Sequence, residues 1–108
     1  MIRLSVMYPA TPESHFNWEY YLGPHLELAS RLLSSRGLVR TEIDRGLAGL
    51  PPGTPPPYHA VGHLFFRTLA ELKSALEATS AEFIADERNY TDAPSIVQIS
   101  EVVEKAPE

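Results

Sequence analysis

The sequence predicts an α+β fold of the ferredoxin-like type, with a four-stranded antiparallel sheet and two helices in the order β-α-β-β-α-β. Three observations lead to this prediction. Four short segments have the alternation or the β-branched and aromatic composition of strands, two longer segments have helical spacing, and the length of 108 residues suits one domain. We therefore interpret residues 1–108 as a single domain with both helices on one face of the sheet.

The four predicted strands cover residues 2–8, 38–46, 58–66 and 95–103. In the first, Ile2, Leu4, Val6 and Tyr8 alternate with Arg3, Ser5 and Met7, and prolines follow directly. The segment 47–57 contains five of the ten prolines, so it is predicted to be a stiff, irregular loop between the two middle strands.

The first predicted helix covers residues 16–35, with Ser14 or Asn17 as N-cap and Gly37 in a left-handed conformation after its end. Pro24 is expected to kink this helix or split it. The second helix begins after a capping box at Thr68 and Glu71. Because Thr79 and Glu82 repeat that pattern, we expect the second helix to break into two short pieces.

The sheet is predicted to need a cover on its second face. The strands at 2–8 and 95–103 place aliphatic residues on both of their faces, whereas a single layer of helices covers one face only. A homodimer that closes sheet against sheet would bury the second face.

Composition argues against several classes of protein. The net charge is −5 and the basic residues are scattered, so no nucleic-acid partner is expected. No segment approaches the roughly 18 apolar residues of a membrane span, and the first residues lack the apolar stretch of a signal peptide. We therefore expect a cytoplasmic protein without a membrane partner.

Residue usage also bears on cofactors. The absence of cysteine excludes disulfides, thiolate nucleophiles and cysteine-based metal sites in this chain. The acidic and histidine residues show none of the familiar metal-ligand spacings, and no glycine-rich phosphate loop follows a strand. No metal and no other cofactor is expected.

His25 is the first candidate for chemistry, because helical spacing places it near the middle of the apolar face of the first helix. It is either a hydrogen-bonded core histidine or a general acid or base in a pocket. Tyr21, one turn earlier, lies on nearly the same side and either hydrogen-bonds the ring or a ligand oxygen or is part of the core packing. Trp18 is either an apolar wall of the pocket or core packing.

The remaining candidates come from strands and a turn. His63 follows Gly62, and a glycine within a strand often marks the close approach of another group. His63 is therefore a candidate pocket residue, with a structural or dimer-face role as the alternative. Tyr8 is a second candidate, because it lies at the end of the first strand, at the rim of the sheet. In the turn 89–94, Tyr90 and Asp92 are candidates for the mouth of the pocket, although the turn also serves simply to stop the helix.

Together these segments resemble the EthD family of the dimeric α+β barrel superfamily. The resemblance is carried by YYLGPHLEL at 20–28, by PPPYHAVGHLFF at 55–66 and by NYTDAPSIVQISEV at 89–102. It implies a homodimer with a pocket for a small hydrophobic ligand between helices and sheet in each subunit. Implied catalytic residues are His25, Tyr21 and His63, and implied pocket residues are Tyr8, Trp18, Phe83 and Tyr90.

The resemblance narrows the fold more than the function. The family takes its name from a component of a bacterial ether-degradation operon, and relatives in the superfamily include cofactor-independent monooxygenases, polyketide cyclases and isomerases. We expect a cofactor-free enzyme acting on a small hydrophobic or aromatic oxygenated molecule. A non-catalytic carrier and an accessory subunit of a degradation pathway are the alternatives.

Overall fold

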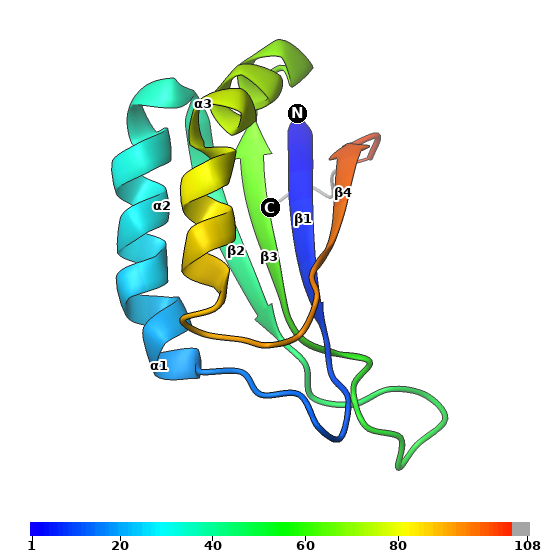
Figure 1. The fold of residues 1–108 in the computed structure, drawn as a ribbon. Helices are drawn as coiled ribbons and strands as arrows, with labels where there is room; N and C mark the ends of the chain where they lie inside the picture. Colours follow the sequence, from blue (N-terminus) through cyan, green and yellow to red (C-terminus); the bar gives the residue numbers. More distant parts are fainter. Residues whose placement is uncertain (105–108) are drawn as a thin grey trace.

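A sheet of four antiparallel strands carries a layer of helices on one face (Figure 1). The computed structural model describes residues 1–104. Its strands are β1 (Ile2–Pro9), β2 (Leu38–Arg45), β3 (Tyr58–Phe66) and β4 (Ile96–Glu101), in the spatial order β2-β3-β1-β4. Its helical segments are α1 (Trp18–Tyr20), η1 (Tyr21–His25), α2 (Leu26–Leu33), η2 (Ser34–Arg36) and α3 (Leu69–Glu87). The predicted α+β ferredoxin-like arrangement is confirmed.

The first helical region is interrupted where the sequence predicted it to be. Asn17 caps the helix by accepting a hydrogen bond from the amide of Tyr20, and η1 is a single wide π-helical stretch that contains Pro24. Proline has no amide hydrogen to complete the regular helical pattern, so the wider turn accommodates it. Gly37 ends the region in the left-handed conformation, with φ of 97°.

The second helix differs from the prediction, because α3 is continuous from Leu69 to Glu87. Thr68 caps it as expected, but Thr79 does not start a second helix. The Thr79 hydroxyl donates instead to the carbonyl of Ala75, 2.7 Å away, which satisfies the polar side chain within the helix. The expected break is therefore wrong, and α3 places one uninterrupted face against the sheet.

Strand register decides which side chains meet the helices. Leu4 pairs with Leu64 and Tyr8 with Ala60, and these residues are buried or half-buried beneath the helix layer. Two clusters form that side of the core. One contains Leu4, Leu33, Phe66, Leu72 and Ala75, and the other contains Tyr8, Tyr21, Ala60 and Tyr90.

The opposite face of the sheet, called the open face below, is more polar than predicted. On β1 it presents Arg3, Ser5 and Met7, so Met7 is the only aliphatic residue there, and the expectation of aliphatic residues on both faces of this strand is largely wrong. Phe65 on β3 is nevertheless 3% exposed, and the guanidinium of Arg40 lies over its ring, 3.9 Å from the ring centre.

Candidate functional site

A cavity of about 290 Å³ lies between the helices and the sheet. Its wall is mostly apolar and comes from η1, α2, α3 and all four strands, with Tyr90 at one side. Two lining residues, Ile84 on α3 and Val97 on β4, are 73% and 56% exposed, so the cavity opens to solvent between α3 and β4. The volume is roughly twice that of an engineered protein cavity that binds benzene, about 150 Å³.

His25 and Asp86 form a hydrogen-bonded pair beside this cavity. His25 Nδ1 lies 2.9 Å from Asp86 Oδ2, and the two side chains are 12% and 9% exposed. Asp86 also accepts hydrogen bonds from the Tyr20 hydroxyl at 2.6 Å and from Asn89 Nδ2 at 3.2 Å, both at Oδ1. One carboxylate thus joins the end of α3 to the π-helical stretch that carries His25.

These hydrogen bonds keep Asp86 ionised. Burial alone would raise the pKa of Asp86, but the bonds from Tyr20, His25 and Asn89 outweigh it and hold the pKa below its ordinary value. An ionised carboxylate can only accept, so the proton between the two groups belongs to His25 Nδ1. In the neutral ring Nε2 then carries a lone pair, and it has no hydrogen-bond partner within residues 1–104.

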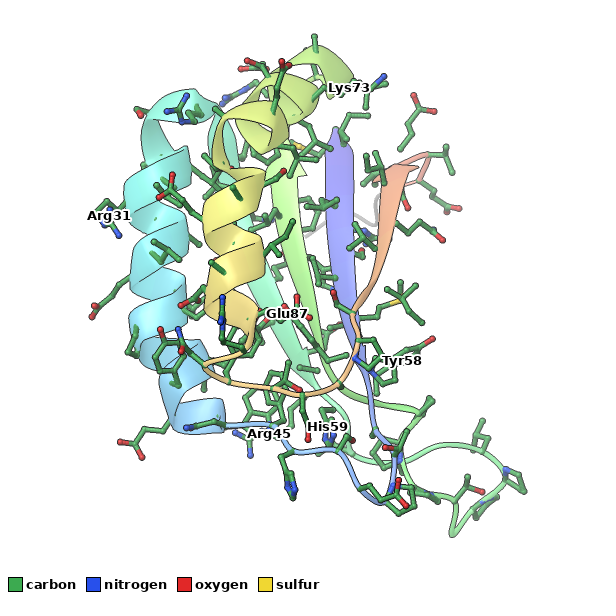
Figure 2. All side chains as sticks on the ribbon, in the orientation of Figure 1. Arg31, Arg45, Tyr58, His59, Lys73 and Glu87 are labelled. Atoms are coloured by element: carbon green, nitrogen blue, oxygen red, sulfur yellow. The ribbon has the colours of Figure 1, made fainter. Side chains whose placement is uncertain are left out.

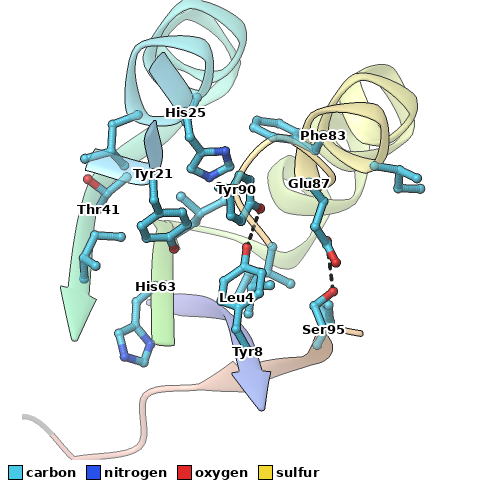
Figure 3. Close-up of a pocket in the computed structure, with 18 of the residues that line it drawn as sticks. Leu4, Tyr8, Tyr21, His25, Thr41, His63, Phe83, Glu87, Tyr90 and Ser95 are labelled. Carbon is cyan, nitrogen blue, oxygen red and sulfur yellow. Dashed lines mark hydrogen bonds between the residues drawn. The ribbon is translucent and has the colours of Figure 1, made fainter. Parts of the chain in front are cut away.

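Aromatic rings hold the imidazole in place. The ring of Tyr21 stacks on it at 4.8 Å with an angle of 11° between the planes, and the ring of Tyr90 lies 4.7 Å away (Figure 3). Phe83 approaches edge-on at 6.2 Å. With Nδ1 bonded to Asp86, one face stacked on Tyr21 and Tyr90 beside both rings, the imidazole has one preferred orientation.

Phenol groups cluster in the same part of the cavity. The hydroxyls of Tyr8 and Tyr90 lie 2.7 Å apart, so one donates to the other and leaves the second O–H available. Burial raises the pKa of Tyr8, Tyr21 and Tyr90, which are 2–4% exposed, so all three stay neutral near pH 7. Neutral phenols surrounding an imidazole can donate hydrogen bonds to a ligand oxygen.

Gly62 on β3 makes room for Tyr21. A Cβ at this position would collide with the Tyr21 hydroxyl, which cannot withdraw because the ring is 2% exposed and stacked on His25. The close approach that the sequence predicted at Gly62 is therefore confirmed, and the approaching group is Tyr21.

We expect Gly62→Ala to lower the free energy of unfolding by about 1–3 kcal/mol, the usual range for overpacking. Urea unfolding measures the change. Gly23→Ala is the matched control, because a Cβ there meets no atom within 4 Å. Adding Tyr21→Phe to the Gly62→Ala variant removes the obstructing hydroxyl and should restore part of the lost free energy of unfolding. A Gly62→Ala variant as stable as the parent would contradict this account.

The EthD domain family matches residues 10–94 of the chain. This range contains His25, Asp86 and two of the three buried tyrosines, Tyr21 and Tyr90, but not Tyr8. The chain belongs to the EthD family.

Solved structures agree with membership of the EthD family. An EthD-like protein from Ralstonia eutropha JMP134 is 31% identical, with a TM-score of 0.89 over 97% of this chain and 94% of that one. A candidate monooxygenase from Shewanella loihica PV-4 is 10% identical, with a TM-score of 0.60 over 96% and 95%. A dimeric ferredoxin-like protein from an uncultured marine organism is 15% identical, with a TM-score of 0.53 over the whole of both chains. The last two show the fold alone. No curated protein is significantly similar to the chain.

The structure of this EthD-family chain shows which of the predicted site residues line the cavity. Tyr8, Tyr21, His25, Phe83 and Tyr90 all line the cavity. His63 borders it from β3, but its ring lies on the open face, where it is 2.9 Å from both Ser5 Oγ and Asp44 Oδ2 (Figure 3). The rings of His63 and His25 are thus on opposite faces of the sheet.

Two other candidates lie outside the cavity lining. Trp18 packs on Phe16 and Tyr21 and is covered by the guanidinium of Arg45, 4.2 Å from its ring centre. Asp92 is not among the residues that line the cavity, and its carboxylate accepts a hydrogen bond from the amide of His15 at 2.8 Å. That bond holds the pKa of Asp92 below its usual range and ties the turn to the segment before α1.

The sequence interpretation missed Asp86 and Glu87. Along α3 the buried residues Leu72, Ala75, Thr79 and Asp86 follow one helical stripe, and a carboxylate on such a stripe needs a buried partner. The expected break at Thr79 hid this continuation. Glu87 was missed because nothing in its local sequence distinguishes it from an exposed acid at a helix end.

Residues 1–104 contain no group of three or more histidine or acidic side chains placed to bind a metal ion. Likewise, no helix among these residues is both long and apolar enough to cross a bilayer.

Proposed function

We propose that this EthD-family protein is an enzyme that moves a proton on a small hydrophobic, oxygenated molecule, with His25 as the general base. The observation that carries the proposal is that His25 lines an apolar cavity while its Nδ1 is hydrogen-bonded to Asp86. Asp86 holds the proton on Nδ1 and would stabilise the imidazolium that forms when Nε2 accepts a proton. This division of roles is the one that carboxylate–histidine pairs have in other enzymes.

The tyrosines supply the second half of the proposed chemistry. Removing a proton from carbon next to a carbonyl group leaves negative charge on the carbonyl oxygen, and preorganised donors stabilise that charge. Tyr21 and the Tyr8–Tyr90 pair are neutral donors in the same cavity. Proton abstraction of this kind is common to the isomerase, cyclase and cofactor-independent oxygenase reactions that remain open for the chain.

The proposal is tested by hydrogen–deuterium exchange at carbon. Acetophenone has acidic methyl protons next to a carbonyl group, and its exchange in D₂O can be followed by NMR. We expect the protein to accelerate exchange above a buffer blank and above an equal concentration of denatured protein. Binding of acetophenone without acceleration would favour a carrier, and neither binding nor acceleration would favour an accessory subunit.

We also propose that the protein is a homodimer joined through the open face of the sheet. On this face Met7 and Val61 are only half-buried, so a second sheet packed against it would bury further apolar area. The dimeric ferredoxin-like protein from the marine organism supports the proposal at the level of fold.

Sedimentation should give a mass near twice the 12.0 kDa of the chain at micromolar concentration, and dilution should lower the melting temperature. We expect Met7→Arg on the open face to shift the equilibrium toward monomer. Ser30→Arg, on an exposed position of α2, is the control and should not. A stable monomer of the unmodified chain at micromolar concentration would overturn this proposal.

A further inference from the structure

The cavity wall carries an uneven charge. Among the described residues, no lysine or arginine lines it, and Glu87 is the only acidic residue that does. Figure 2 shows labelled basic residues elsewhere: Arg31 projects outward from α2, and Lys73 lies at the other end of α3 from Glu87. The cavity therefore has a negative group near its opening and no lysine or arginine on its wall to balance it.

Glu87 is positioned to meet a ligand. It is half-buried at the end of α3, and its Oε2 accepts a hydrogen bond from the Ser95 hydroxyl at 3.1 Å. This bond leaves Oε1 without a hydrogen-bond partner among residues 1–104. Figure 3 shows Glu87 across the cavity from Tyr21, on the side of Ser95 and β4. The free carboxylate oxygen of Glu87 thus lies across the cavity from the Tyr21 phenol.

The charge of Glu87 already acts on its surroundings. After burial and the effects of Tyr90, it is a further reason why the pKa of Tyr8 is raised, and it acts in the same direction on Tyr90. The negative charge that disfavours ionisation of these phenols also disfavours the binding of a ligand that carries a carboxylate. The same carboxylate favours a ligand group that donates a hydrogen bond to it.

We propose that the cavity selects an uncharged ligand that places a carbonyl oxygen at the tyrosine cluster and a hydroxyl group against Glu87 Oε1. The ligand class is therefore a small hydroxylated ketone, and carboxylates are excluded. This inference rests on the proposed function, because it names the substrate class of the same site.

Three probes of similar size separate the effects of a carbonyl, a hydroxyl and a carboxylate group on binding. Acetophenone has the carbonyl alone, 3-hydroxyacetophenone adds a hydroxyl, and 3-acetylbenzoate adds a carboxylate. Titration calorimetry on the intact protein should show 3-hydroxyacetophenone binding about 10-fold more tightly than acetophenone, as expected for a hydrogen bond to a charged group. We expect 3-acetylbenzoate to bind at least about 10-fold more weakly than acetophenone.

Glu87→Gln keeps the size and a hydrogen-bond acceptor but removes the charge. It should bring the affinity for 3-acetylbenzoate to within about threefold of that for acetophenone, whose own affinity should stay within about twofold of the parent value. Glu82→Gln, an exposed position of the same helix outside the cavity lining, removes the same charge and should leave all three affinities unchanged.

The outcomes distinguish the two proposals. If acetophenone binds and exchanges but the three probes have equal affinities, or if Glu87→Gln leaves their ratios unchanged, this inference is wrong and the proposed function stands. If none of the probes binds, both are overturned. Tight binding of 3-acetylbenzoate by the parent protein would by itself exclude the proposed ligand class.

Discussion

Replacing His25 with asparagine is expected to slow the exchange of acetophenone methyl protons by about 10²- to 10⁴-fold, the range usually contributed by a general acid or base. Asparagine is close to histidine in size and can still contact Asp86, but it cannot accept a proton near neutral pH. The affinity for acetophenone should change little, because binding depends mainly on the apolar wall. NMR exchange rates and calorimetry on the same samples measure the two quantities.

A matched histidine variant controls for general effects of the substitution. His59 contacts Ser14 Oγ at 2.8 Å and stacks on Phe16, outside the lining of the cavity. His59→Asn should therefore retain the parent exchange rate. Equal exchange rates in His25→Asn and the parent would exclude His25 as the base, and loss of affinity without loss of rate would indicate a purely binding role.

The fold was predictable because each of its elements carries its own local signal. Each signal depends on only a few neighbouring residues. These signals are the two-residue alternation of the strands, the cap at Asn17, the proline in the first helical region and the glycine after it. The error in the helices, the expected break at Thr79, arose because a capping pattern is ambiguous: a threonine hydroxyl can cap a new helix or bond to the preceding turn. Packing of α3 on the sheet favours the continuous helix.

The site was only partly predictable because its main contact joins distant segments. Helical spacing placed His25 on an inward face, but its partner Asp86 is 61 residues away. Likewise, alternation alone could not say which face of β3 meets the helices, and the register places Gly62 under Tyr21 and the His63 ring on the other side. To predict a site whose residues pair across the fold, the strand register and the packing must be known as well as the local motif.

Asp86→Asn is expected to slow exchange by about 10²- to 10⁴-fold without removing the base itself, as the equivalent change does in carboxylate–histidine pairs. Asparagine offers both an acceptor and a donor to His25 Nδ1, so the proton is no longer fixed there. Asp86 is a positioning residue in this account. Nitrogen NMR of the imidazole should show more of the Nε2–H tautomer in the variant, a signature that simple loss of packing would not produce.

The same substitution should change how stability depends on pH. The folded-state pKa of Asp86 lies below the ordinary value of 3.8, so its contribution to stability is present above about pH 4 and is lost as the pH falls through the folded pKa. At pH 7 we expect Asp86→Asn to lower the free energy of unfolding by about 1–3 kcal/mol, because its neighbours lose an ionised acceptor. Urea unfolding at a series of pH values should show that difference narrowing below pH 3.8, where the parent carboxylate also takes up a proton. A difference that stays constant down to pH 2 would mean that the Asp86 charge contributes nothing and that only its shape matters.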